Sequence, residues 1–181
     1  LDTGFPRIPG DVGSPDTFPF PVRHAIVTGA TVDAIVHRRE DVLLPRFIAA
    51  ARGLVDAGCV GIASTCGFLV RWQREMARAL TVPVLTSGLL QVPLVERTLP
   101  AGRAVGIVTY SALDLDRDTL AAAGIAADVR VEGVAPESYF GRTIRDGASA
   151  LDRTRMAHDV VATARRLVEQ HPCVGALVLE C

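Results

Sequence analysis

The chain has 181 residues, of which 49% are hydrophobic and 22% charged, with a formal net charge of −1. This length and composition allow one large or two small globular domains with a proper core, and the near-neutral charge argues against a nucleic-acid or membrane-surface role. All 19 basic residues are arginine, so this segment has no lysine to form a Schiff base with pyridoxal phosphate.

No signal peptide is visible, and no apolar run approaches the roughly 18 residues of a membrane span. The four cysteines lack the spacing of a zinc or thioredoxin site. We therefore expect a cytoplasmic protein with reduced thiols, without a metal and without a cofactor.

An alternating pattern of strands and helices follows a loop, rich in proline and glycine, over residues 3–23. In chain order we expect a strand at 25–28, a helix at 41–57, a strand at 60–64, a helix at 68–80, a strand at 82–85, a helix at 89–99, a strand at 104–108, a helix at 116–123, a strand at 129–131, a helix at 151–169 and a strand at 174–179. Such alternation predicts an α/β fold with parallel sheets.

Pro100-Ala101-Gly102 indicates a hinge. It divides the chain into a first α/β unit, residues 1–100, and a second, residues 101–181. Leu1-Asp2-Thr3 resembles the exit of a missing strand, and the sequence stops at the end of another. We therefore expect two pseudo-symmetric parallel-sheet units that face one cleft, in a chain truncated at both ends.

A repeated template supports the two-unit interpretation. Residues 44–66 and 157–181 share the phase of an amphipathic helix, a following Cys-Val-Gly, a short apolar strand and a final cysteine, Cys66 in one copy and Cys181 in the other. Ligands bind at the carboxyl ends of parallel strands. Taken alone, either cysteine would more often be a core residue, but their matching positions favour a pair of thiols across one cleft.

Two such thiols predict acid/base chemistry, in which one thiolate removes an α-proton and the other thiol returns a proton to the opposite face. Cys66 directly precedes a predicted helix, whose N-terminus favours the thiolate and also binds a carboxylate. Thr65, Thr109 and Ser111 are either donors to the reacting group or simple helix caps.

The blocks Ser-Thr-Cys-Gly-Phe-Leu at 64–69, Val-Thr-Tyr-Ser-Ala at 108–112 and Leu-Glu-Cys at 179–181, with the opening Leu-Asp-Thr-Gly-Phe-Pro, resemble the aspartate/glutamate racemase superfamily. The resemblance covers essentially the whole chain. It implies a cofactor-independent racemase of aspartate, glutamate or a hydantoin, and a homodimer. It implies that Cys66 and Cys181 are the acid/base pair, and that the substrate carboxylate is bordered by Asp2, Thr3, Thr65, Gly67, Thr109 and Ser111.

Three other functions stay open. One is a maleate isomerase-like enzyme with a single nucleophilic cysteine, and another is a relative that only binds a small carboxylate. A cysteine hydrolase is disfavoured because no histidine lies at a predicted strand end. Gly67-Phe68 stands where glutamate racemases typically have Asn-Thr, which favours a substrate less polar than glutamate.

Overall fold

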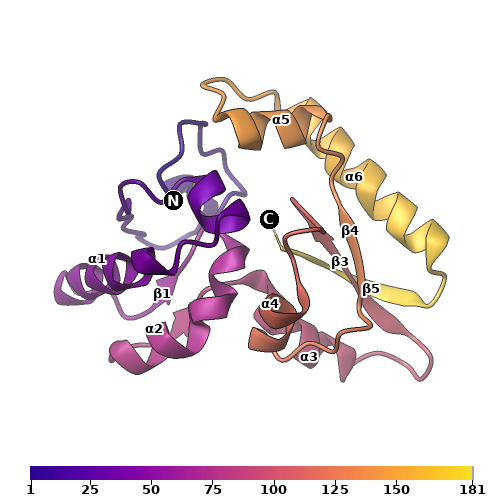
Figure 1. Ribbon diagram of the computed structural model, residues 1–181, viewed down its shortest axis with the longest axis horizontal. Coiled ribbons are helices and arrows are strands. Elements are labelled where there is room, and N and C mark those ends of the chain that lie inside the picture. Colours follow the sequence, from indigo (N-terminus) through magenta and orange to yellow (C-terminus); the bar gives the residue numbers. More distant parts are fainter. Residues whose placement is uncertain (181) are drawn as a thin grey trace.

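The computed structural model describes residues 1–180 as a mixed α/β fold with two small parallel sheets (Figure 1). The first sheet pairs β1 (Ile62–Ala63) with β2 (Val84–Leu85). The second has the order β4-β3-β5, in which β3 (Ala104–Thr109) lies between β4 (Arg130–Gly133) and β5 (Val174–Leu179). The expected parallel α/β architecture is confirmed at this level.

The helices of the first half surround the small sheet. They begin with η1 (Pro15–Thr17), the π-helical turn η2 (Asp33–His37) and η3 (Asp41–Leu43), which leads into α1 (Leu44–Asp56). The predicted helix at 68–80 is a 3-10 segment, η4 (Gly67–Trp72), that continues as α2 (Gln73–Ala79). The predicted helix at 89–99 is likewise η5 (Gly88–Gln91) followed by α3 (Val92–Glu96).

The helices of the second half are α4 (Arg117–Ala122), α5 (Tyr139–Asp146) and α6 (Arg153–Gln170). Side chains at their N-termini satisfy backbone N–H groups that lack a partner in the helix. Asp116 accepts from Thr119 N at 2.9 Å, and Asp152 accepts from Thr154 N at 3.0 Å and Arg155 N at 3.1 Å. Helix α6 then packs across β3 and β4 (Figure 1).

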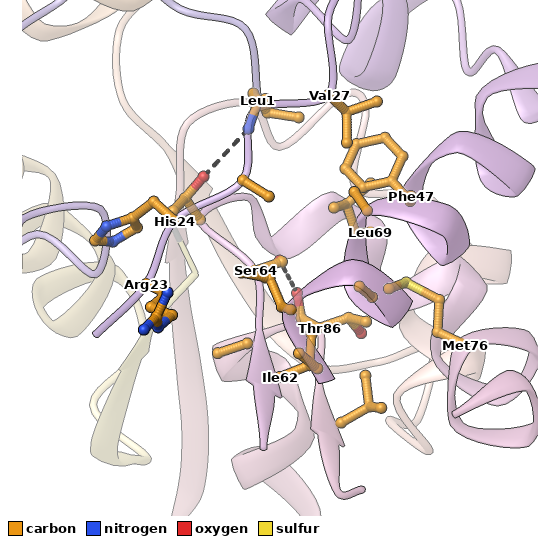
Figure 2. Close-up of a pocket in the computed structure, with 17 residues that line it drawn as sticks. Leu1, Arg23, His24, Val27, Phe47, Ile62, Ser64, Leu69, Met76 and Thr86 are labelled. Atoms are coloured by element: carbon orange, nitrogen blue, oxygen red, sulfur yellow. Dashed lines mark hydrogen bonds between the residues drawn. The ribbon is translucent and has the colours of Figure 1, made fainter. Parts of the chain in front are cut away.

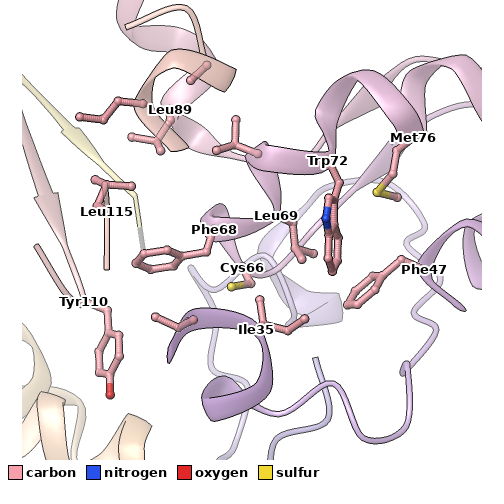
Figure 3. Close-up of a cluster of buried hydrophobic side chains, with 14 of the residues drawn as sticks. Ile35, Phe47, Cys66, Phe68, Leu69, Trp72, Met76, Leu89, Tyr110 and Leu115 are labelled. Atoms are coloured by element: carbon pink, nitrogen blue, oxygen red, sulfur yellow. The ribbon is translucent and has the colours of Figure 1, made fainter. Parts of the chain in front are cut away.

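The core lies between the two sheets and the helices that cover them. β3 is the central strand, and its residues from Val105 onward are buried. A continuous run of apolar residues is expected of a strand that is covered on both faces. Figure 3 shows the neighbouring cluster, where the ring of Phe47 lies 5.5 Å from that of Trp72.

Two local expectations are wrong. Residues 25–28 form no strand, because Val27 O instead accepts a turn hydrogen bond from Ala30 N at 3.0 Å. Helix α5 was not predicted. Its closing Gly147 has the left-handed φ of 63° that a helix C-cap requires.

Candidate functional site

A pocket of about 800 Å³ lies where the carboxyl ends of both sheets approach each other. Residues at or just after the carboxyl ends of β1, β2, β3 and β5 line this pocket. The loop at the start of the chain and helices α5 and α6 line the rest of it. The residues at the strand ends are Thr65, Cys66, Gly67, Ser87, Gly88, Tyr110, Leu179 and Glu180. Ligands bind at this edge of parallel sheets.

Cys66 stands at the junction between β1 and η4 and is 4% exposed. Ser64 fixes the turn, because its hydroxyl donates to Cys66 O at 2.8 Å and to Thr86 O at 2.6 Å, which links the ends of β1 and β2. Figure 3 shows the thiol among apolar side chains that include Ile35 and Phe68. The sulfur therefore reaches the pocket from an apolar wall.

Burial, followed by the nearby Glu180, raises the pKa of the Cys66 thiol to about 12, against the opposing effect of the Phe68 backbone N–H. The expectation of a thiolate at this position is therefore wrong for the chain without a ligand. The removal of the sulfur from water outweighs the single N–H at the start of a short 3-10 helix.

Glu180 follows β5, lines the pocket and is 6% exposed. Its backbone N donates to Val108 O at 2.9 Å, and its Oε2 accepts a hydrogen bond from the Thr109 hydroxyl. Within residues 1–180, its Oε1 has no partner. Burial raises the pKa of Glu180 to about 7, against the opposing effect of the Thr109 hydrogen bond.

Gly67 makes room for this carboxyl group. A Cβ at this position would collide with Glu180 Oε1 and would lie 2.8 Å from both Glu180 O and Ser87 Oγ. A glycine is therefore required by the close approach of the two strand ends.

The structure brings together part of the predicted site. Thr3, Thr65, Gly67 and Cys66 all line the pocket. Thr109 is fully buried behind it and reaches it through Glu180.

Two predicted residues lie elsewhere. The Asp2 carboxylate accepts from Gly29 N at 2.9 Å, and the Ser111 hydroxyl donates to Asp114 Oδ2 at 2.5 Å, so both hold loops. Neither lines the described part of the pocket. Cys181 lies outside the described residues, and its role stays a prediction.

Sequence reasoning missed several residues of the pocket. Glu180 lines the pocket, and its place directly after a strand is the sequence signal that favours a cleft carboxylate over a surface residue. Arg153 at the start of α6 lines the pocket and makes no hydrogen bond or ion pair within the described chain. Arg7 also lines it, but is paired with Asp11 at 2.9 Å. Tyr110 and Phe140 add aromatic surface.

A second cavity, of about 90 Å³, lies behind the first sheet (Figure 2). It shares Leu1, Ser64 and Thr65 with the large pocket and is otherwise mainly apolar, with Phe47 and Met76 in its wall. Its size suits a water molecule or a small group rather than a metabolite. The large pocket is therefore the candidate active site.

Comparisons with curated proteins find several relatives that are named dimethylsulfoniopropionate lyases. A dimethylsulfoniopropionate lyase of Durusdinium sp. clade D is 26% identical over 187 aligned positions, which cover all of this chain and 62% of that protein. Dimethylsulfoniopropionate lyase 5 of Emiliania huxleyi is 27% identical over 190 positions, all of this chain and 38% of that protein. Lyase 7 of the same organism is 34% identical over 112 positions, 60% of this chain and 32% of that protein.

The chain thus spans less than two thirds of the curated relatives that it matches. No protein-family model and no solved structure matches it. The identification as a member of the aspartate/glutamate racemase superfamily is wrong, because the relatives carry the name of a lyase. The racemase and isomerase activities fall with it, and the maleate isomerase-like and binding-only alternatives gain no support.

None of the helices between residues 1 and 180 combines the length and the apolar character that a bilayer span requires. The same residues contain no cluster of three or more His, Cys, Asp or Glu side chains arranged for a metal ion.

Proposed function

We propose that this chain carries the active site of a lyase that cleaves dimethylsulfoniopropionate, or a close analogue, into dimethyl sulfide and acrylate. The observation that carries the proposal is the alignment of the whole chain with lyases of that name. The pocket is consistent with such a substrate, because it combines a thiol and a carboxyl group with cationic and aromatic residues. A few convergent polar groups in a mainly apolar cleft are typical of an active site for a small molecule.

The reaction is an elimination across two carbons. A base takes a proton from the carbon next to the carboxylate, and the electrons of that C–H bond form the new C=C bond. The C–S bond breaks with its electron pair on sulfur, so the positively charged sulfonium leaves as neutral dimethyl sulfide. The leaving group needs no proton, and the protein must supply a base and stabilise the charge that develops on the carboxylate.

We assign these two tasks to the predicted cysteine pair. Cys66 is a neutral thiol near pH 7 because burial raises its pKa to about 12, so it suits donation of a hydrogen bond to the charge that develops on the substrate. Proton removal then falls to Cys181, which directly follows Glu180 in the sequence. Thr3 and Thr65 border the same pocket and are further donors toward the carboxylate.

We also propose that the two sheets belong to related units, residues 1–100 and 101–181, that face a common cleft. The support is geometric, because residues after β1 and β2 meet residues after β3 and β5 around one pocket. A homodimer remains part of this proposal, and light scattering coupled to size exclusion would test it.

The test of function is the release of both products. The purified chain is incubated with dimethylsulfoniopropionate, and dimethyl sulfide in the headspace and acrylate in solution are quantified by chromatography. We expect equal amounts of both, and a loss of rate of about 100-fold or more in Cys66→Ser and in Cys181→Ser. Cys59→Ser is the matched control, because Cys59 does not line the pocket. Absence of both products, from a folded chain, would refute the proposal.

A further inference from the structure

Glu180 has an unusual environment for a carboxyl group. It lines the pocket of about 800 Å³ and has little access to water. Thr109 donates to Oε2, and Oε1 has no hydrogen-bond partner within residues 1–180. A buried acceptor without a partner is costly, so such a group in a pocket indicates a role toward a ligand.

The surrounding charges leave this carboxylate without a counter-ion. Arg7 is the partner of Asp11, at 2.9 Å, and Arg153, at the start of α6, forms no ion pair with Glu180. The groups next to Glu180 are the Cys66 thiol, the Ser87 hydroxyl and the Thr109 hydroxyl, none of them cationic. The Leu1 ammonium and the Arg71 guanidinium lower the pKa of Cys66, but neither shifts that of Glu180. A ligand can supply the positive charge that the described residues do not.

The pocket also has the surface that an alkylated cation prefers. Tyr110 and Phe140 line it together with aliphatic side chains such as Ile144 and Val160. A sulfonium or quaternary ammonium group cannot donate a conventional hydrogen bond, and it is bound through an opposite charge and through aromatic faces. A pocket that holds both an unpartnered carboxylate oxygen and aromatic rings offers both.

We propose that Glu180 recognises the onium cation of the substrate, and so selects onium carboxylates over neutral carboxylates of the same shape. This inference rests on the proposed function, because a sulfonium is the positive end of the substrate assigned above. Thr109 and Gly67 are the positioning residues, one by its hydrogen bond and the other by the space that it leaves. Arg153 then faces the pocket as the available partner for the carboxylate end of the same zwitterion.

Two ligands of matched shape test the proposal without turnover. 3-(Trimethylammonio)propanoate carries a quaternary ammonium, and 4,4-dimethylpentanoate has a carbon atom in place of its nitrogen. Isothermal titration calorimetry at pH 8 is expected to show that the wild-type chain binds the cationic ligand about tenfold or more tightly. Glu180→Gln, which can still accept from Thr109, is expected to remove that preference. Glu96→Gln removes an exposed carboxylate outside the pocket and is expected to keep it.

A pH series on the wild-type chain gives a second readout that needs no variant. Glu180 gains a proton as the pH falls below about 7. The Leu1 ammonium also lines the pocket, and burial lowers its pKa from 8.0, so its titration acts on the carboxylate that both ligands share. The preference, measured as the ratio of the two affinities, is therefore expected to decline between pH 8 and pH 5.5.

The outcomes separate the two proposals. Equal binding of the two ligands by the wild-type chain, no binding of the cationic one, or a preference that survives in Glu180→Gln would overturn the role of Glu180. A preference that depends on Glu180, found in a chain that releases no dimethyl sulfide, would overturn the lyase proposal and leave the recognition of an onium carboxylate standing.

Discussion

The contact between Gly67 and the end of β5 gives the sharpest prediction from the structure. In Gly67→Ala, the new Cβ would collide with Glu180 Oε1 and would lie 2.8 Å from Glu180 O and from Ser87 Oγ, where an ordinary contact is about 3.5 Å or more. The carboxyl group can rotate away, but the Glu180 carbonyl belongs to the backbone that follows β5. Overpacking of this kind costs about 1–3 kcal/mol, which corresponds to a fall in Tm of roughly 2–12 °C for a chain of this size.

Thermal and urea denaturation measure this cost, with Gly53→Ala as the matched control. Gly53 lies within α1, and a Cβ there meets no atom within 4 Å, so alanine is expected to stabilise the chain by about 0.5–1 kcal/mol. The double variant Gly67→Ala/Glu180→Ala lacks the carboxyl contact and is expected to lose less than the sum of the two single variants, by about 0.5–3 kcal/mol. A Gly67→Ala chain as stable as the wild type would show that the two strand ends do not meet as described.

Three further predictions concern the buried groups of the pocket. Burial raises the pKa of Glu180 from 4.5 to about 7, so the folded chain keeps a proton that the unfolded chain has lost between these pH values. The wild-type chain should therefore lose about 3 kcal/mol of stability as the pH rises from 4.5 to 7, and equal pH profiles for wild type and Glu180→Gln would contradict this. The pKa of Cys66 is about 12, whereas that of an ordinary cysteine is 9.0. At pH 8 the Cys66 side chain should therefore be thiolate about 1,000-fold less often than an unperturbed thiol. Iodoacetamide, followed by peptide mass spectrometry, should accordingly label it far more slowly than the partly exposed Cys59 and Cys173. Thr109→Val removes the donor to Glu180 and should destabilise the chain by about 1–3 kcal/mol more at pH 8 than at pH 5, which denaturation at the two pH values measures; an equal loss at both would contradict the assigned hydrogen bond.

Most regular elements were predictable from apolar periodicity, because burial of one face is a local property of the sequence. The central strand β3 and the long helix α6 lie within a few residues of their predicted positions. Helix α5 was not predictable in this way. Its Phe140 N donates to Asp159 Oδ2 on α6 at 2.9 Å, so a contact between segments 19 residues apart stabilises it.

The place of the candidate pocket was predictable from the topology of the sheets, whereas the pKa values of its residues were not. Parallel strands bring their carboxyl ends to one edge, so residues such as Cys66 and Glu180 had to lie near one pocket once the strands were known. Their ionisation depends on how completely the fold removes them from water. Cys66 precedes a helical segment, yet it is 4% exposed, and burial has the larger effect.

The racemase prediction was wrong, and the strand-end pattern on which it depended indicates only the first step of a reaction. Racemisation and elimination both begin when a base removes the proton next to a carboxylate. They differ in the second step, because racemisation returns a proton to the same carbon and elimination expels a leaving group from the adjacent carbon. The residue that contacts the leaving group therefore distinguishes the two reactions. Glu180, which is proposed here to face the cation, is not a member of the cysteine pair on which the racemase prediction depended.

The electrostatics of the pocket connect substrate binding to the ionisation of both groups. In the chain without a ligand, burial raises the pKa of Glu180, and burial together with Glu180 raises the pKa of Cys66. A cation held against Glu180 favours the ionised carboxylate, and it also offsets the negative charge that acts on the nearby thiol. A neutral carboxylate of the same shape supplies no such charge. Selection of an onium substrate and adjustment of the acid/base groups would then follow from one ion pair, formed only when the pocket is occupied.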